Sequence, residues 1–152
     1  MIGIKSILSI KYLSKGLLKE LRKSRSFGFM HSVIRTATFL GDARAAGLSE
    51  DGQQLIVVAI SENPKLGDIM PGTGGCRKVR FAGKGKGKRG GYRTVHYFAA
   101  DDVPVVLLAL ISKGERSDLS KSEQNELKKE MAGYADDYRA GVRRKLTMLE
   151  RR

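Results

Sequence analysis

The sequence is poor in the residues from which metal centres and disulfides are built. Of its 152 residues one is a cysteine, Cys76, and two are histidines, His31 and His96. A single cysteine excludes an intrachain disulfide and a cysteine zinc cluster, and two histidines are too few for a histidine metal site. This composition favours a protein that works in a reducing cytoplasm.

Long apolar runs are also missing. The first ten residues look apolar, but Lys5, Lys11 and Lys15 interrupt the stretch before the apolar core of a signal peptide develops. No segment approaches the roughly 18 to 20 apolar residues that a membrane-spanning helix needs. We therefore expect a soluble, cytoplasmic protein with no membrane partner.

Acidic residues are absent from one long stretch, and this absence concentrates the positive charge. The formal net charge is +13, and residues 69–100 carry eight Lys/Arg and no acid. Residues 1–29 carry seven Lys/Arg against Glu20 alone, a net +6, so the remainder of the chain is close to neutral. A positive charge of this size, concentrated in two stretches, predicts a polyanionic partner, with nucleic acid favoured over a membrane.

The length suits a single domain with appended ends. Residues 10–23 space their leucines as a basic amphipathic helix does, and Met30 offers an alternative start. Residues 1–29 are interpreted either as an extension outside the working domain or as a helix that adds affinity for RNA or the ribosome. We expect the working domain at 30–131 and a basic C-terminal helix or tail at 132–152.

The first half of that domain is expected to combine a strand with two helices. Val33, Ile34 and residues 36–39 favour a strand, and residues 39–46 a short helix ended by Gly47. Ser49 resembles an N-cap, and the following helix is expected to stop at Asn63-Pro64 because the residue before proline disfavours helical dihedrals. The β-branched residues 56–58 leave a strand as the alternative there.

The second half is expected to be an antiparallel meander followed by helix. Strands are predicted at 76–82, 91–99 and 103–113, and the third is apolar on both faces, as a central strand is. Ser120 and Glu123 have the spacing of a capping box for a helix that ends at Gly133, and 134–150 favour another helix. The predicted class is α+β.

The basic stretch becomes a candidate site when it is placed on strands. Residues two apart share a face, so Lys78 and Arg80 point one way and Arg77 the other, while Arg93 and Tyr97 share a face of the next strand. In simple register the cations that converge on a phosphate are Lys78, Arg80, Arg93 and Lys113. A merely solvated face would mix signs of charge, which this one does not. Tyr92 and Tyr97 are candidates for stacking on bases, with core packing as the alternative.

The Gly-Lys segment 83–91 is predicted to be a loop whose cations close over a nucleic-acid backbone. Those cations are Lys84, Lys86, Lys88 and Arg89, joined on the adjacent strand by Arg77. The alternative is a plain hairpin connection. Residues 85–90 match GxGxxG, but a strand follows where a dinucleotide fold requires a helix, so that motif is rejected.

Four blocks of sequence resemble the RelE/HigB toxins of the RelE/ParE superfamily, which belong to type II toxin–antitoxin systems. The blocks begin at Asn63 (NPKLGD), Pro71 (PGTGGCRKVRF), Lys84 (KGKGKRGGYR) and Lys113 (KGERSDLS). They occur in the family's order and spacing, and the resemblance covers about residues 30 to 131. It implies a RelE/ParE-like fold, with an N-terminal strand and helices packed on a small antiparallel sheet and a C-terminal helix.

The resemblance also implies an activity. It suggests an mRNA interferase that enters the ribosomal A site, cleaves the mRNA there without metal or organic cofactor, and is restrained by a cognate antitoxin, of the helix-turn-helix HigA-like type. In this chemistry the ribose 2′-OH attacks the adjacent phosphate. The enzyme must therefore accept one proton, stabilise the charged intermediate-like state and protonate the leaving 5′-oxygen.

Carried over by position, Lys78 and Arg80 match the family's paired basic strand residues, and Arg93 matches the arginine of its Gly-Tyr-Arg motif. Crowded positive charge favours the neutral form of a lysine, so Lys78 or a neighbour is a candidate base, with Arg80 and Arg93 holding the phosphate. The chain has Gly114 where RelE places a further arginine and Ser120 where RelE has a tyrosine, so Lys113 is the expected substitute. Because these two residues of the family pattern are missing, cleavage is expected to be slow or assisted by the ribosome.

Two other functions fit the sequence. A non-catalytic RNA- or ribosome-binding protein needs only the net charge and the Gly-Lys loop. A ParE-like gyrase inhibitor would use the same fold without RNA cleavage.

Overall fold

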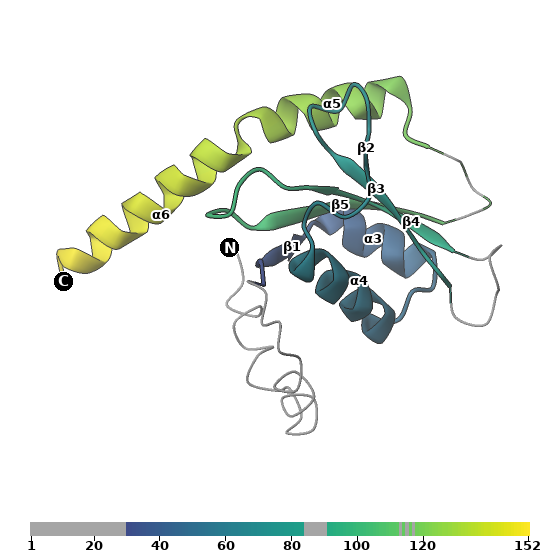
Figure 1. Cartoon of the computed structure of the whole chain (residues 1–152). Coiled ribbons are helices and arrows are strands. Elements are labelled where there is room, and N and C mark those ends of the chain that lie inside the picture. The colour runs from purple at the N-terminus through teal and green to yellow at the C-terminus, as the bar shows by residue number, and fades with distance from the viewer. Residues whose placement is uncertain (1–29, 84–90, 113, 115, 117) are drawn as a thin grey trace.

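A five-stranded sheet with helices on both faces forms the body of the protein (Figure 1). The computed structural model describes residues 30–83, 91–112, 114, 116 and 118–152. Helices α3 (Ala37–Ala45) and α4 (Glu50–Glu62) cover one face of the sheet, and α5 (Lys121–Ala132) covers the other. Helix α6 (Tyr134–Glu150) continues from α5 and runs out beyond the sheet. The predicted α+β class is confirmed.

The sheet is mixed, with the order β1-β5-β4-β3-β2. Strands β3 (Arg77–Phe81), β4 (Tyr92–Tyr97) and β5 (Val105–Ser112) form the predicted antiparallel meander. The N-terminal strand β1 (Val33–Arg35) pairs with β5 in the parallel direction. Strand β2 (Asp68–Ile69) adds an antiparallel edge that the sequence did not predict, because two residues are too few to show an alternating pattern.

Strand β5 is the centre of the molecule, as its apolar sequence predicted. Val105, Leu107 and Leu110 belong to a core cluster with Phe39 of α3 and Ile60 of α4. Residues that point the other way, including Val106 and Ile111, form a second cluster against which Leu127 and Met131 of α5 pack. An irregularity in the pairing of β4 with β5, at Val95/His96, keeps both Leu108 and Ala109 on the second side.

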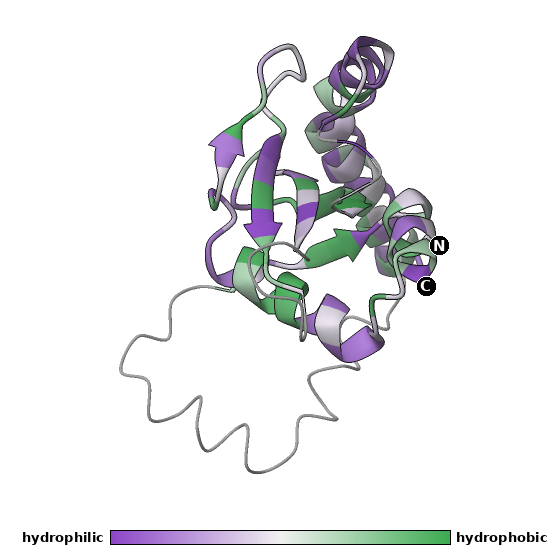
Figure 2. Cartoon of the chain, turned by 90° about the vertical axis from the view of Figure 1, so that its right-hand side faces the viewer, coloured by the Kyte–Doolittle hydropathy of each residue, from purple (hydrophilic) through white to green (hydrophobic). Residues whose placement is uncertain are grey.

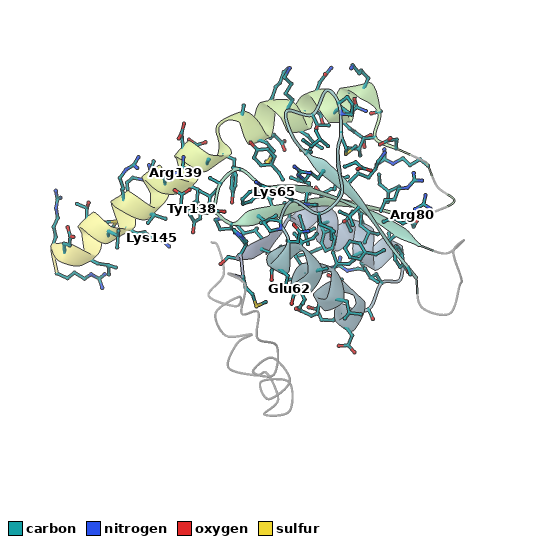
Figure 3. The ribbon with its side chains drawn as sticks, viewed as in Figure 1. Glu62, Lys65, Arg80, Tyr138, Arg139 and Lys145 are labelled. Atoms are coloured by element: carbon teal, nitrogen blue, oxygen red, sulfur yellow. The ribbon has the colours of Figure 1, made fainter. Side chains whose placement is uncertain are left out.

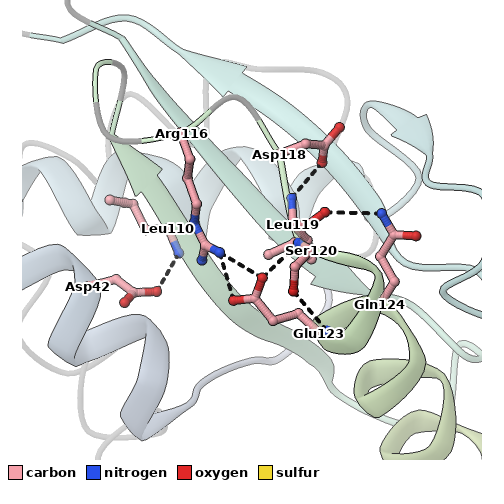
Figure 4. A network of polar contacts seen from close by, with 8 residues as sticks. All are labelled: Asp42, Leu110, Arg116, Asp118, Leu119, Ser120, Glu123 and Gln124. Carbon is pink, nitrogen blue, oxygen red and sulfur yellow. Dashed lines mark hydrogen bonds and ion pairs between the residues drawn. The ribbon is translucent and has the colours of Figure 1, made fainter.

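Helix α3 starts earlier than predicted, which corrects the strand expected at 36–39. Thr36 is its N-cap and accepts a hydrogen bond from the Phe39 amide, so only residues 33–35 are extended. Side chains of this segment also hydrogen-bond the backbone of β5 beyond the residues that pair with β1. The Thr36 hydroxyl donates to the Leu108 carbonyl at 3.2 Å, and Asp42 accepts from the Leu110 amide at 3.0 Å (Figure 4). These contacts explain why polar side chains replace a strand here.

Helix α4 has the predicted ends. The Ser49 side chain accepts from the Gly52 amide, and the helix stops at Glu62, before Asn63-Pro64. Arg35 on β1 donates to Glu50 at 2.8 Å and to Gln53 at 3.1 Å, which ties the start of the helix to the sheet.

Helix α5 begins with the capping box that the sequence predicted. Ser120 accepts from the Glu123 amide, and the Glu123 carboxylate accepts from the Ser120 amide at 2.7 Å (Figure 4). Arg116 donates to both oxygens of Glu123, at 2.8 and 2.6 Å. These donors lower the Glu123 pKa to about 2, and the Arg116 guanidinium is the largest cause. The start of α5 is therefore fixed relative to the segment that leads into it.

Within the described residues, the polar contacts of helix α6 with the body of the protein lie near its start. The Tyr134 hydroxyl donates to the Pro104 carbonyl at 2.9 Å, and Arg139 makes a two-bond ion pair with Asp102, at 2.6 and 2.7 Å. None of the helices in the described part of the chain is long and apolar enough to cross a membrane.

Candidate functional site

Three cationic side chains gather on one face of the sheet, as predicted. Arg80 of β3 lies directly opposite Arg93 of β4, and Lys78 lies two residues from Arg80 on the same strand face. Directly opposed residues have Cβ atoms about 4.5 to 5.5 Å apart, so the two guanidinium groups start from neighbouring positions. This is the α5 face, because Cys76, two residues before Lys78, and Val95, two residues after Arg93, lie in the cluster under α5. We call Lys78, Arg80 and Arg93 the cationic face.

The alternation of polar and apolar residues along the strands creates this face. Figure 2 shows hydrophilic and hydrophobic bands following one another on the strands. Val79, between the two cations of β3, is buried, whereas Arg80 is exposed and Lys78 is partly exposed. Arg80 reaches solvent at one end of the sheet (Figure 3). A substrate can therefore approach these cations without any opening of the core.

An acid that the sequence analysis missed lies beside the cations. Lys78 Nζ and Asp118 Oδ2 are 2.6 Å apart, and Asp118 Oδ1 accepts from the Leu119 amide at 2.9 Å. The hydrogen bond from Lys78 holds the Asp118 pKa below its usual range, and the charge of Arg93 adds to this effect. A carboxylate thus contacts one of the predicted phosphate-binding cations and lies within the electrostatic influence of a second, next to the start of α5.

Asp118 lies 40 residues from Lys78 in the sequence. The contact depends on how the segment before α5 crosses the sheet, which no local pattern encodes. The one local signal near Asp118 was the capping box that begins at Ser120, two residues downstream, because it fixes where the segment before α5 ends. The pairing also relieves the crowding of positive charge on which the predicted role of Lys78 as a base rested.

Arg77 and Tyr92 are directed to the opposite face from the cations. The Arg77 guanidinium donates to the carbonyls of Lys65 and Gly67, at 3.1 and 3.0 Å, and Tyr92 packs against the cluster under α3 and α4. His96, the cross-strand neighbour of Arg77, is buried and hydrogen-bonds the Pro64 carbonyl at 2.9 Å. Burial lowers the His96 pKa. Arg77 and His96 together hold the loop between α4 and β2.

Tyr97 shares the α5 face with Arg93 but lies further along it. Its ring meets that of Tyr134 edge to face, with centroids 6.4 Å apart, and it packs against the cluster under α5. RNA binding by Arg77, Tyr92 and Tyr97 stays a prediction, and each of them has a structural contact that accounts for its position.

Five predicted site residues lie outside the described residues: Lys113, Lys84, Lys86, Lys88 and Arg89. Of the two positions where the chain departs from the RelE pattern, Gly114 has a positive φ of 117°, a conformation that favours glycine. The other, Ser120, uses its hydroxyl to cap α5.

Comparison with known proteins identifies the family of the chain. The family model for the RelE toxin of the RelE/RelB toxin–antitoxin system matches residues 32–150. The chain belongs to this family of toxin–antitoxin toxins. A solved structure of the E. coli toxin RelE, a double arginine-to-alanine mutant in the free state, is 20% identical; the match covers 66% of this chain and 96% of that one, with a TM-score of 0.43.

Proposed function

We propose that the chain is a ribosome-dependent mRNA endonuclease that inhibits translation, and that its cationic face holds the phosphate at which the mRNA is cut. Membership of the RelE toxin family supports action as a toxin with an antitoxin partner. The observation that carries the cleavage proposal is the direct pairing of Arg80 with Arg93, with Lys78 beside them.

Two adjacent guanidinium groups are suited to a phosphodiester. Each arginine offers a planar fork of donors that matches two phosphate oxygens. Charge fixed on neighbouring strands needs little reorganisation when negative charge develops on the phosphorane-like state, so it stabilises that state more than the starting phosphodiester. The site needs no base recognition to do this.

The proposed reaction is an internal transfer at phosphorus. The ribose 2′-oxygen forms a bond to the adjacent phosphorus while the bond from phosphorus to the 5′-oxygen breaks. One proton passes from the 2′-OH to a general base and one is delivered from a general acid to the 5′-oxygen, so the reaction consumes no water and yields a 2′,3′-cyclic phosphate and a 5′-hydroxyl. Arg80 and Arg93 would bind the phosphate oxygens, and Lys113 is the proposed proton donor.

Asp118 pairs with one of the proposed phosphate-binding cations. Its carboxylate neutralises Lys78 and lies within the influence of Arg93, as a phosphate oxygen would. When mRNA binds, its phosphate would compete with this carboxylate for the same donors. Lys78 would then exchange one anionic oxygen for another, which favours entry of substrate only where other contacts, such as those of the ribosome, add binding energy.

The experiment is to map mRNA ends in a purified translation system supplied with the wild-type protein, Arg93→Ala or Arg44→Ala. Arg44 is an exposed arginine in the last turn of α3, the helix on the opposite face of the sheet, so it matches the loss of charge. We expect codon-phased cuts with wild type and Arg44→Ala, and at least a hundredfold loss with Arg93→Ala, in the range for one lost transition-state donor.

Ribosome binding, measured in parallel by co-sedimentation, separates the alternatives. Intact binding by Arg93→Ala assigns the residue to the chemistry. Binding by the wild type without any cut would contradict the endonuclease and favour a non-cleaving ribosome-binding protein. Inhibition of gyrase supercoiling by a wild type that neither binds ribosomes nor cuts would favour a ParE-like inhibitor.

A further inference from the structure

Helix α6 carries an apolar row past the edge of the body. Tyr134 begins the row and packs against the cluster on the sheet. Tyr138, Val142 and Leu146 follow at intervals of four, so they lie on the same side of the helix. Val142, Leu146 and Leu149 are 40%, 54% and 64% exposed, on the part of the helix that Figure 1 shows running clear of the sheet. The apolar row that packs against the sheet at Tyr134 therefore continues onto the exposed part of α6.

The flanks of this row are strongly basic. Residues 138–152 contain six Lys/Arg and one acid, Glu150, a net +5. Arg139 is paired with Asp102, whereas Arg143, Arg144 and Lys145 make no ion pair within the described residues. Asp136 and Asp137 lie in the first turn of α6, so the positive excess is confined to the later part of the helix and the residues after it.

The spacing is that of a helix–helix seam. Tyr138, Val142, Lys145 and Leu149 follow one another at intervals of four, three and four, the a/d pattern of a two-helix contact. Lys145 therefore falls within the apolar seam. It lies on the part of α6 that runs clear of the sheet (Figure 3). A lysine at a seam position requires an acidic partner opposite, since an unpaired buried charge is costly.

We propose that residues 138–149 dock an acidic amphipathic helix of another polypeptide. A second copy of this chain is disfavoured because two copies of residues 138–152 would bring +5 against +5 and one Lys145 seam against another. A membrane surface is disfavoured because the apolar seam is narrow and interrupted by a lysine. The proposal uses a surface separate from the cationic face and does not depend on RNA cleavage.

The probe is a synthetic peptide of about three heptads with leucine at a and d, glutamate at e and g, and one glutamate in the seam opposite Lys145. Its binding to the full chain is followed by fluorescence anisotropy at physiological salt. A scrambled peptide of the same composition controls for charge. Leu55→Glu is the matched control for Leu149→Glu, because Leu55 of α4 is 67% exposed and Leu149 64%.

We expect Leu149→Glu to weaken binding at least about tenfold, the effect of replacing an apolar contact of the seam by a charge, and Leu55→Glu to leave it unchanged. Lys145→Glu should also weaken binding, and a peptide with lysine at the opposing seam position should restore it. Leu149→Ala, which adds no charge, should lie between wild type and Leu149→Glu. Circular dichroism checks that each variant is folded.

Other outcomes overturn the proposal. Equal binding of the scrambled peptide would leave only non-specific charge attraction. Anionic phosphatidylglycerol vesicles that bind in a Leu149-dependent way, without peptide binding, would identify a membrane surface. A dimer of the wild type that Leu149→Glu dissociates would identify a second copy as the occupant.

Discussion

Single residues decide the balance of charge at the cationic face. Lys78, Arg80 and Arg93 could be placed from the sequence because strand alternation fixes which residues share a face, and the register of neighbouring strands fixes which residues meet. Asp118 could not be placed in this way, because its contact with Lys78 spans the sheet and the start of α5. The predicted group of cations therefore includes one carboxylate, that of Asp118, which is paired with Lys78.

Asp118→Asn should tighten binding of single-stranded RNA. The change removes the negative charge beside Lys78 and Arg93 but keeps an oxygen that can accept from the Leu119 amide. An exposed ion pair of this kind contributes up to about 1 kcal/mol, which corresponds to about fivefold in affinity. Fluorescence anisotropy with a short labelled RNA measures the change.

Asp51→Asn is the control for the gain of one unit of net charge, because Asp51 lies in the first turn of α4, away from the cationic face. It should alter affinity little. If Asp118→Asn bound RNA no better than Asp51→Asn, competition between Asp118 and phosphate would be ruled out.

Gly67→Ala should destabilise the fold. Gly67 has a φ of 85°, and an added Cβ would meet the backbone carbonyl of Lys78 on the neighbouring strand. Strain and a backbone clash together should cost more than about 1 kcal/mol. Gly41→Ala is the counterpart, since Gly41 lies within α3 with open space around it, and it should stabilise the protein by about 0.5 to 1 kcal/mol. Urea unfolding measures both; equal effects would contradict this account of Gly67.

At the scale of elements, the sequence predicted what local chemistry controls. The caps at Ser49 and Ser120, the stop before Pro64 and the meander of β3, β4 and β5 are confirmed, because each depends on residues close together in the chain. The strand expected at 36–39 is wrong, because Thr36 caps a helix whose β-branched start resembles a strand. The parallel pairing of β1 with β5 joins segments 72 residues apart and has no local signal.

The start of α5 should depend on pH through Glu123. Its folded pKa is about 2, below the ordinary value of 4.5, so its ionised form stabilises the fold above about pH 4.5. That contribution is lost as the pH falls toward 2, when the carboxylate is protonated in both states. Wild type should therefore melt at a higher temperature than Glu123→Gln at pH 6, and the gap should close between pH 4.5 and 2.

Thermal unfolding of the two proteins across this range measures the gap. Because other carboxylates titrate in both proteins, the difference isolates Glu123. A gap that stays constant down to pH 2 would show that the ion pair with Arg116 contributes nothing pH-dependent to stability.

At the scale of the whole molecule, the charge is divided between two surfaces. The cationic face lies at the end of the sheet beside the start of α5, and the basic flanks of α6 extend beyond the sheet (Figures 1 and 3). The sequence indicated the first through its run of cations without acid. The sequence predicted the second only as a basic helix or tail, because the structure is needed to show that the apolar row of α6 is exposed. The division of the chain at 29 and 131 stays a prediction.

The central claim is that the cationic face promotes attack by a ribose 2′-OH on its own phosphodiester. The most direct measurement places a single 2′-deoxynucleotide at the cleaved position of an mRNA programmed in the ribosomal A site. We predict that the deoxy mRNA still recruits the protein to the ribosome but is not cut, while the ribose control yields a 2′,3′-cyclic phosphate end. Cleavage of the deoxy mRNA at an undiminished rate would contradict the account.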